Sequence, residues 1–292
     1  MRYLDGAAVR AAVSIPAAVS ALRSGLAASA PPQPVRSSTA WTGGELLVMP
    51  AEAGSVAGVK LATVGSGPVR VQGVYVLFDA ATLTPLVVAD AVSLTLLRTA
   101  ALSALAVAHL APSSASRLAV VGTGPQAREH ARAMCAVRPI TSVVVRGRAP
   151  DRASALANAL HDELGVAATA GSDVSGADIV CLCTTATTPV VSAADLAPAA
   201  CVTAIGAHVP DAREVAADVV ASSFVVVDDA SAARQEAGDL IMAIAEGAVS
   251  EEVFDVDLAA LARGSVAVPP GRTLFKSVGF GLADLLVARL LA

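Results

Sequence analysis

The spacing of apolar and polar residues changes twice along the chain, which predicts regions of different structure. The first residues have the pattern of two short helices, with Asp5 and Ser14 as N-caps and Pro16 in the first turn of the second helix. Residues 36–86 contain apolar runs of strand length separated by glycine and proline, which predicts an antiparallel sheet. A long apolar helix is expected over residues 91–110.

From residue 117 onward, strand-like and helical segments alternate. A strand at 117–122 precedes a helix at 125–137, and another strand precedes a helix at 151–164, for which Asp151 is the expected N-cap. Further buried strands are expected at ADIVCLCTT, CVTAIGA and SFVVVDD. Such alternation predicts a mostly parallel sheet covered by helices. More helical patterns follow residue 254, the last over about residues 275–291.

The composition narrows the class of protein. Of 292 residues, 55% are hydrophobic and 15% are charged, with a formal net charge of −5, so the chain can bury a large core. Clusters of Lys and Arg are lacking, which argues against a nucleic acid partner. Arg98 interrupts the apolar helix at 91–110, and this favours a buried core helix over a membrane span.

The cysteines carry no obvious chemistry. Four are present: Cys135, Cys181, Cys183 and Cys201. No second Cys or His pair stands at metal-ligand spacing, so we expect no metal site and interpret the cysteines as small buried hydrophobic residues. Free thiols fit a reducing compartment, and we expect the protein in the cytoplasm.

The turn GTGPQA at 122–127 follows a predicted strand and precedes a predicted helix. In a G-x-G-x-x-A turn, Gly122 permits the sharp reversal and Gly124 lets the backbone approach a pyrophosphate. Ala127 lets helix and strand pack closely, and the helix N-terminus attracts the anion. Because the strand and helix context is present, the turn predicts a Rossmann-type dinucleotide site.

The end of the next strand indicates which dinucleotide binds. NAD(H) usually meets a carboxylate there, but this segment reads VVVRGRAPDR, with no acid before Asp151. Arg146 and Arg148 supply donors that suit a 2′-phosphate, so we expect NADP(H) in preference to NAD(H).

Cations outside the Rossmann region indicate an anionic partner. Lys60 lies within an apolar strand and Arg98 within the apolar helix, and buried cations are costly unless they are paired. Acidic residues are scarce nearby, so a substrate carboxylate is a candidate partner for these residues and for Arg36. Ordinary structural ion pairs are the alternative.

Several motifs together resemble the ornithine cyclodeaminase/mu-crystallin family. They are LLRTAALSALA (96–106), VVGTGPQA (120–127), EAGDL (236–240) and TLFKSVGFGLADLLVA (273–288), and LLVMPA before VKLATV agrees. The resemblance spans nearly the whole chain in order. It implies an α/β fold, in which a Rossmann domain is inserted into an α+β substrate-binding and dimerisation domain, and it implies a homodimer.

The resemblance also implies domain limits and site residues. The substrate-binding and dimerisation domain would cover 1–112 and the Rossmann domain 113–271, and residues 272–292 would form a C-terminal helix that returns to the first domain. Residues Arg36, Lys60 and Arg98 would bind the substrate carboxylate. The expected cofactor contacts are Arg98, Thr99, Gly122, Gly124, Pro125, Gln126, Arg146, Arg148, Thr184, Ser277, Val278 and Gly279.

The departures from the family point to one branch. Ornithine cyclodeaminases carry an Asp that acts on the substrate amine, and His208 of IGAHVPDAREV stands at that position. They also carry a Glu two residues before Met-Pro, where this chain has Leu47. Without these carboxylates the chain resembles the ketimine and Δ1-pyrroline-2-carboxylate reductases. Arg70, where the family often has Thr, is another departure that bears on cofactor contacts.

The predicted reaction is NAD(P)H-dependent reduction of a small cyclic ketimine carboxylate. Δ1-Pyrroline-2-carboxylate, reduced to L-proline, is the lead substrate, and the piperideine homologue follows. The proton donor to the imine nitrogen is Lys60 or His208, and both remain open. The alternatives are an ornithine cyclodeaminase, an alanine or opine-type amino-acid dehydrogenase, and a catalytically silent dinucleotide-dependent binding protein.

Overall fold

The structure, a computed structural model, describes residues 1–28, 33–65 and 71–292; Arg70 lies outside these ranges. The described chain forms two compact units. Unit 1 comprises Met1–Ala101 with Gly279–Ala292, and unit 2 comprises Leu102–Val278. The sequence placed the boundaries after residues 112 and 271, whereas the compact units divide within a long helix and just after the last strand.

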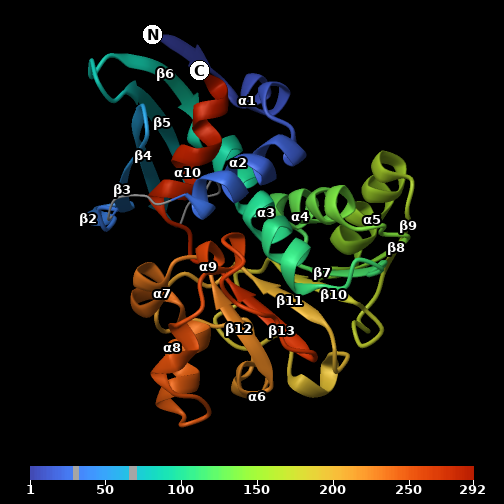
Figure 1. The fold of residues 1–292 in the computed structure, drawn as a ribbon. Helices are drawn as coiled ribbons and strands as arrows, with labels where there is room; N and C mark the ends of the chain where they lie inside the picture. Colours follow the sequence, from blue (N-terminus) through green and yellow to red (C-terminus); the bar gives the residue numbers. More distant parts are fainter. Residues whose placement is uncertain (29–32, 66–70) are drawn as a thin grey trace. The chain divides into compact units, whose positions relative to one another are not determined.

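Among the described residues, six strands form the sheet of unit 1, in the order β1-β6-β5-β4-β3-β2 (Figure 1). They are β1 (Arg2–Leu4), β2 (Ser37–Trp41), β3 (Gly44–Ala53), β4 (Val56–Gly65), β5 (Val71–Asp79) and β6 (Pro85–Asp90). The pairings from β2 to β6 are antiparallel, which confirms the prediction for this region. Strand β1 was not predicted and pairs with β6 in parallel.

The helices of unit 1 cover one face of this sheet. Helices α1 (Gly6–Ala12) and α2 (Ile15–Ala27) begin as predicted, since Asp5 accepts the amide hydrogen bond of Ala8 and Ser14 that of Ala17. Helix α10 (Gly281–Ala288), followed by the 3-10 turn η3 (Arg289–Leu291), packs on β3, β4 and α2. The covered face is buried and carries Lys60 among apolar neighbours such as Met49, Ala62, Tyr75 and Leu77.

The sheet of unit 2 is entirely parallel across the described strands, as predicted, in the order β12-β13-β11-β10-β7-β8-β9. Its members are β7 (Arg117–Val121), β8 (Ser142–Arg146), β9 (Ala167–Ala170), β10 (Ile179–Leu182), β11 (Cys201–Ala204), β12 (Ser223–Val227) and β13 (Arg272–Lys276). The chain leaves β7 first toward β8 and later returns to its other side at β10. This reversal marks the place where open α/β sheets bind ligands, at the carboxyl ends of the strands.

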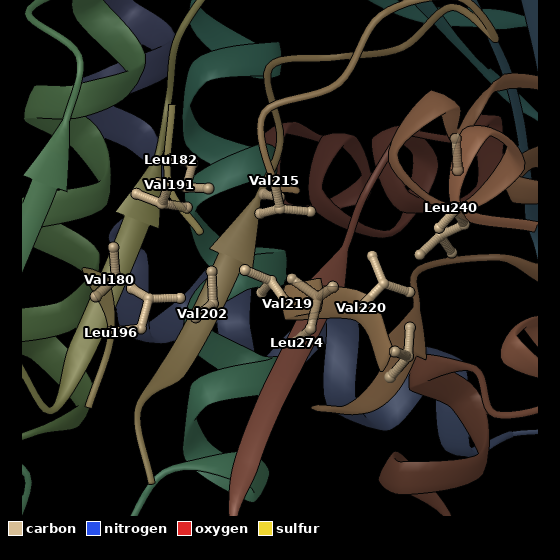
Figure 2. Packing of buried hydrophobic residues seen from close by; sticks show 14 of the residues in the cluster. Val180, Leu182, Val191, Leu196, Val202, Val215, Val219, Val220, Leu240 and Leu274 are labelled. Carbon is tan, nitrogen blue, oxygen red and sulfur yellow. The ribbon is translucent and has the colours of Figure 1, made fainter. Parts of the chain in front are cut away.

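Helices and a valine-rich core surround the sheet of unit 2. The helices are α4 (Pro125–Val137), α5 (Pro150–Leu164), α6 (Ala217–Ala221), α7 (Ala230–Glu236), α8 (Gly238–Ala245) and α9 (Leu258–Ala262), with 3-10 turns η1 (Ala193–Asp195) and η2 (Glu251–Phe254). Figure 2 shows Val180, Val202 and Leu274 of the strands packed with Val219 and Val220 of α6. This core fixes the strand ends from which the site loops leave.

Helix α3 (Ala91–Leu110) has the predicted bounds. It is long and apolar enough to cross a membrane by length and composition, but 78% of its apolar window is buried inside the protein, as in a core helix.

Two local predictions were wrong. Helix α5 begins at Pro150 with Ala149 as N-cap, because proline suits the first helical position, and Asp151 lies in the first turn instead of capping it. The helix predicted from about residue 275 begins only at Gly281, because Arg272–Lys276 forms strand β13. All residues of β13 are buried, so the segment lacks the polar alternation that separates a strand from a buried helix.

Candidate active site

A buried cluster of charged side chains lies on the covered face of the unit 1 sheet. Lys60 of β4 places Nζ 2.8 Å from Oδ2 of Asp284, and Arg98 of α3 donates from Nε to Oδ1 of Asp284 at 2.9 Å. The exposed fractions of the three side chains are 5%, 6% and 0%. Two cations therefore share one carboxylate in a nearly dry environment.

This cluster tunes the acidity of its members. Burial lowers the pKa of Lys60 to about 8, with the charge of Asp284 opposing the shift and that of Arg98 adding to it. Burial alone would raise the pKa of Asp284, but Arg98 and Lys60 hold it below its ordinary value. Lys60 is thus an ammonium that releases its proton much more readily than an exposed lysine.

The cluster carries surplus positive charge. Arg36 is half-buried just before β2, and its charge lowers the pKa of Lys60 further. Gly279 lies against the guanidinium, since a Cβ there would stand 2.8 Å from both Nη1 and Nη2 of Arg98. Lys60 and Arg98 thus bring two positive charges to the single negative charge of Asp284, an arrangement suited to an anionic ligand. Thr99, the next residue on α3, is 6% exposed.

The sequence interpretation missed Asp284. It held that acids are scarce near Lys60 and Arg98, and this is wrong because Asp284 reaches both from the C-terminal helix. A signal was present in the sequence, since Asp284 is an isolated acid within the apolar run GFGLADLLVARLLA. Because acids are rarely buried unless they are paired, Asp284 in this apolar run indicates a cationic partner.

In unit 2 the glycine turn lies at the reversal of the sheet. Gly122 has φ +128°, its amide donates to the carbonyl of Arg146 at 2.8 Å, and a Cβ there would collide with the carbonyl of Cys183. Gly124 caps α4 without a side chain and faces open space. The buried Oε1 of Gln126 has no hydrogen-bond partner among the described residues. The open backbone of this turn, at the N-terminus of α4, fits a dinucleotide pyrophosphate.

The residues predicted to select the dinucleotide flank this turn. Arg146 ends β8 half-buried, and Arg148 follows it on the exposed loop before α5. Pro125 is the first residue of α4 and is exposed.

A buried carboxylate ties together the loops that follow β10 and β11. Glu214 is fully buried; its Oε1 accepts from the amide of Thr184 at 2.8 Å and from the Thr184 hydroxyl at 2.7 Å. Its Oε2 accepts from the amide of Gly206 at 2.6 Å. Burial raises the pKa of Glu214, and the charge of Lys276 opposes the shift. Glu214 thereby fixes Thr184, one of the predicted cofactor contacts.

A second buried pair supports the same loops. Lys276, at the end of β13, forms an ion pair of 2.6 Å with Asp239 and donates to the carbonyl of Ala207 at 2.6 Å. Asp239 also accepts from the amide of Glu214 at 2.6 Å. His208, beside Ala207, is exposed, with Nδ1 3.1 Å from the carbonyl of Gly206.

The FKSVG segment is held by another acid that sequence reasoning missed. Asp228, after β12, accepts from the hydroxyl of Ser277 at 2.7 Å and from the amide of Val278 at 3.0 Å. The predicted site residues thus gather in two groups. Unit 1 brings together Lys60, Arg98 and Gly279 near Arg36. In unit 2, Asp228 holds Ser277 and Val278, and Glu214 holds Thr184. The turn at 122–127 is tied to β8 through the hydrogen bond from the Gly122 amide to the Arg146 carbonyl.

Comparisons with known proteins agree with this fold. The Δ1-pyrroline-2-carboxylate reductase of Bacillus cereus is 35% identical over 263 residues, which cover 84% of this chain and 80% of the relative. The solved structure of Thermococcus litoralis Δ1-pyrroline-2-carboxylate reductase in complex with NADH and L-proline matches with a TM-score of 0.93 at 25% identity, covering 99% of this chain and 96% of the other. An archaeal alanine dehydrogenase dimer with bound NAD matches with a TM-score of 0.91 at 25% identity, with coverages of 99% and 94%.

The predicted fold, a Rossmann domain combined with an α+β domain, is therefore confirmed. Residues 7–292 match the ornithine cyclodeaminase/mu-crystallin family as a whole. The motifs at 96–106, 120–127, 236–240 and 273–288 lie within that range. The chain belongs to the ornithine cyclodeaminase/mu-crystallin family.

Proposed function

We propose that this protein is an enzyme that reduces a small cyclic ketimine carboxylate with a nicotinamide dinucleotide, with Δ1-pyrroline-2-carboxylate reduced to L-proline as the lead reaction and the piperideine homologue next. The observation that carries the proposal is the surplus positive charge of the unit 1 cluster, in which Lys60 and Arg98 share Asp284. The reductase from Bacillus cereus and the Thermococcus litoralis complex with NADH and L-proline support the same chemistry.

The side chains of unit 1 suit the substrate. Arg36 and Arg98 bind its carboxylate, which holds the imine carbon in place for reduction. Lys60, with a pKa of about 8, is mostly an ammonium at neutral pH and donates a proton to the imine nitrogen. A cationic amine would be repelled by this cluster, and neither Leu47 nor His208 supplies a carboxylate to receive one.

The side chains of unit 2 suit the cofactor. A bound nicotinamide supplies the hydride for the reduction. The turn at 122–127 binds the pyrophosphate. Ser277 and Val278, held by Asp228, lie where the family resemblance places the nicotinamide. Thr184, held by Glu214, is a further cofactor contact. Arg146 and Arg148 favour NADP(H) over NAD(H), because guanidinium groups bind a 2′-phosphate.

His208 is the other candidate proton donor. Its imidazole is exposed on the loop that Glu214 and Lys276 hold, and an imidazole transfers protons readily near neutral pH. Replacement of Lys60 by Met and of His208 by Ala separates the two roles. The variant that loses the alkaline decline of kcat/KM identifies the donor, since a general acid must be protonated to act.

The decisive assay is NADPH oxidation with a panel of ketimines, run beside ammonia release from ornithine. We expect oxidation with Δ1-pyrroline-2-carboxylate and no ornithine-dependent ammonia. Robust ammonia release would instead show a cyclodeaminase. Reductive amination of pyruvate would show an alanine or opine-type dehydrogenase, and dinucleotide binding without turnover of any of these substrates would show a silent binding protein.

A further inference from the structure

Asp284 has an unusual position for a residue of the C-terminal helix. It is fully buried on α10, whose axis lies over β3 and β4, and each of its oxygens contacts a different cation. Oδ2 pairs with Lys60 at 2.8 Å and Oδ1 with Nε of Arg98 at 2.9 Å. Both cations are residues to which the proposed function gives direct contact with the substrate.

We propose that Asp284 is a positioning residue of the reductase, which holds the Lys60 ammonium as the proton donor and orients the Arg98 guanidinium for the substrate carboxylate. The proposal rests on the proposed function. It gives helix α10 a part in the reaction, through a residue to which the sequence interpretation assigned no role.

The geometry at Arg98 supports the orienting role. Because Asp284 takes Nε, the guanidinium is fixed with its Nη1 and Nη2 edge toward Gly279. Gly279 has φ +83° and no room for a side chain against that edge. The edge that Asp284 does not occupy has the fork geometry that binds a carboxylate through two hydrogen bonds.

The groups around Lys60 support the proton-holding role. Arg98 from α3 and Arg36 from the segment before β2 both disfavour the ammonium, and so does burial. Tyr75 of β5 is paired with Lys60 in the sheet register, and its hydroxyl has no hydrogen-bond partner among the described residues. Against these effects, Asp284 on α10 favours the protonated amine through both its charge and its hydrogen bond to Lys60. Without Asp284 the pKa of Lys60 would fall further below its ordinary value, since burial and the two arginines would then act unopposed by it.

The proton and electron balance of the step is simple. The imine carbon receives a hydride, which carries two electrons, and the imine nitrogen receives one proton from Nζ of Lys60. The imine is reduced to the secondary amine and the dinucleotide is oxidised. Lys60 is left neutral beside Asp284 and regains its proton from water.

The test compares Asp284→Asn with a matched control, Glu163→Gln. Glu163 also binds two cations through its two oxygens, Arg128 at 2.8 Å and Arg132, but on the surface between α4 and α5. One readout is the pH profile of kcat/KM. The other needs no catalysis: the pH dependence of Lys60 acetylation by acetic anhydride, followed by peptide mass spectrometry, reports the pKa of its amine.

We expect Asp284→Asn to move the alkaline decline of kcat/KM and the onset of Lys60 acetylation to lower pH by about 1–3 units, with a higher KM for the ketimine. Glu163→Gln should change neither. A folded Asp284→Asn protein with the wild-type pH profile and wild-type Lys60 reactivity would overturn the proposal. If the wild type reduces no ketimine while acetylation of Lys60 still responds to Asp284→Asn, the proposed function fails and the link between Asp284 and Lys60 stands.

Asp284→Glu is a second test variant, which serves if Asp284→Asn does not fold. It keeps the charge but lengthens the side chain by one methylene, so the alkaline decline should stay near that of the wild type while kcat/KM falls at least about tenfold through misplaced cations. A folded Asp284→Glu enzyme with wild-type kcat/KM contradicts the positioning role.

Discussion

The residues of the charged cluster have different contacts, so their substitutions test different roles. Arg36 acts on Lys60 through its charge, and its replacement leaves Lys60 and Arg98 as partners of the Asp284 carboxylate. We expect Arg36→Ala to lower kcat/KM for the ketimine by about thirty- to a thousandfold, which corresponds to about 2–4 kcal/mol of lost transition-state binding. NADPH affinity, measured by fluorescence titration, should be nearly unchanged. Wild-type imine reduction by Arg36→Ala would place the substrate carboxylate elsewhere.

Arg148 tests the cofactor preference at the same scale. It follows β8 on an exposed loop, where its guanidinium can approach a 2′-phosphate. Arg148→Asp should weaken NADPH use far more than NADH use, because it places a carboxylate where the phosphate would bind. Arg263→Asp, at the end of α9 near the opposite edge of the sheet, makes the same charge change as a control. A wild-type kcat/KM for NADH equal to that for NADPH would refute the preference.

The sequence revealed the cations of the site but not the acids that hold them. Lys60 and Arg98 stand out because a cation within an apolar run is costly and visible. Asp284 is 186 residues from Arg98 in the chain, so no local pattern joins the two. Glu214 and Asp239 lie in segments with ordinary polar composition, and only the folded loops show that they are buried. Pairings of this kind depend on tertiary structure, which local spacing does not encode.

At the scale of elements, the turn between β7 and α4 contains two glycines, and a side chain would have a different effect at each of them. A Cβ at Gly122 would collide with the Cys183 carbonyl, and its φ is +128°. A Cβ at Gly124 would meet nothing within 4 Å, and its φ is −90°. Gly122→Ala should therefore lower the melting temperature, whereas Gly124→Ala should fold normally and bind NADPH at least about tenfold more weakly.

Thermal melts and NADPH titration of both variants check this difference. Gly124→Ala with undiminished NADPH affinity would mean that the turn does not bind the pyrophosphate.

Helices α3 and α4 are linked by a buried histidine. His130 places Nδ1 2.8 Å from the carbonyl of Gln126 and Nε2 3.0 Å from the hydroxyl of Ser103. Burial lowers the pKa of His130 from 6.5 to about 4, so between these pH values the unfolded chain binds a proton that the fold excludes. Above pH 6.5 the imidazole is neutral in both states, so His130 should not change the free energy of unfolding. As the pH drops toward 4, protonation of His130 in the unfolded chain should lower this free energy by up to about 3 kcal/mol.

Urea unfolding of the wild type and His130→Gln across this range isolates the effect. The variant should lose this component of the pH dependence, because glutamine does not titrate. His161→Gln, which removes an exposed imidazole on α5, should keep it. The same pH dependence in the wild type and His130→Gln would contradict a neutral His130 in the fold.

Long elements with clear periodicity were predictable, and so were the buried strands β10 and β11, whereas β1, β9 and β13 were not. Helices α3 and α4 have the predicted bounds, because their apolar spacing extends over several turns. Strand β1 has three residues and β9 four, too few for an alternation to show. Strand β13 has five residues, all buried, and therefore joined the following helix in the sequence pattern.

At the scale of the whole molecule, the second face of the unit 1 sheet is a candidate surface for contact between two copies of the chain. Opposite Lys60, strands β3, β4 and β5 present apolar side chains that are only partly buried: Val48, Val59, Leu61, Val74 and Val76. A sheet face of this composition normally packs against another layer. We therefore propose that two copies of the chain form a homodimer through this face.

Val76 is the residue on which to test this assembly. It pairs with Val59 on one side and Val88 on the other, so a charge at this position would be surrounded by apolar neighbours of both strands. Val76→Lys should shift the protein from dimer to monomer in sedimentation equilibrium, because burying an unpaired ammonium in an interface costs several kcal/mol. Val209→Lys, at an apolar residue of unit 2 that is 42% exposed, should leave the mass unchanged. A Val76→Lys protein that stays dimeric would exclude this face as the interface, and a monomeric wild type would exclude the homodimer itself.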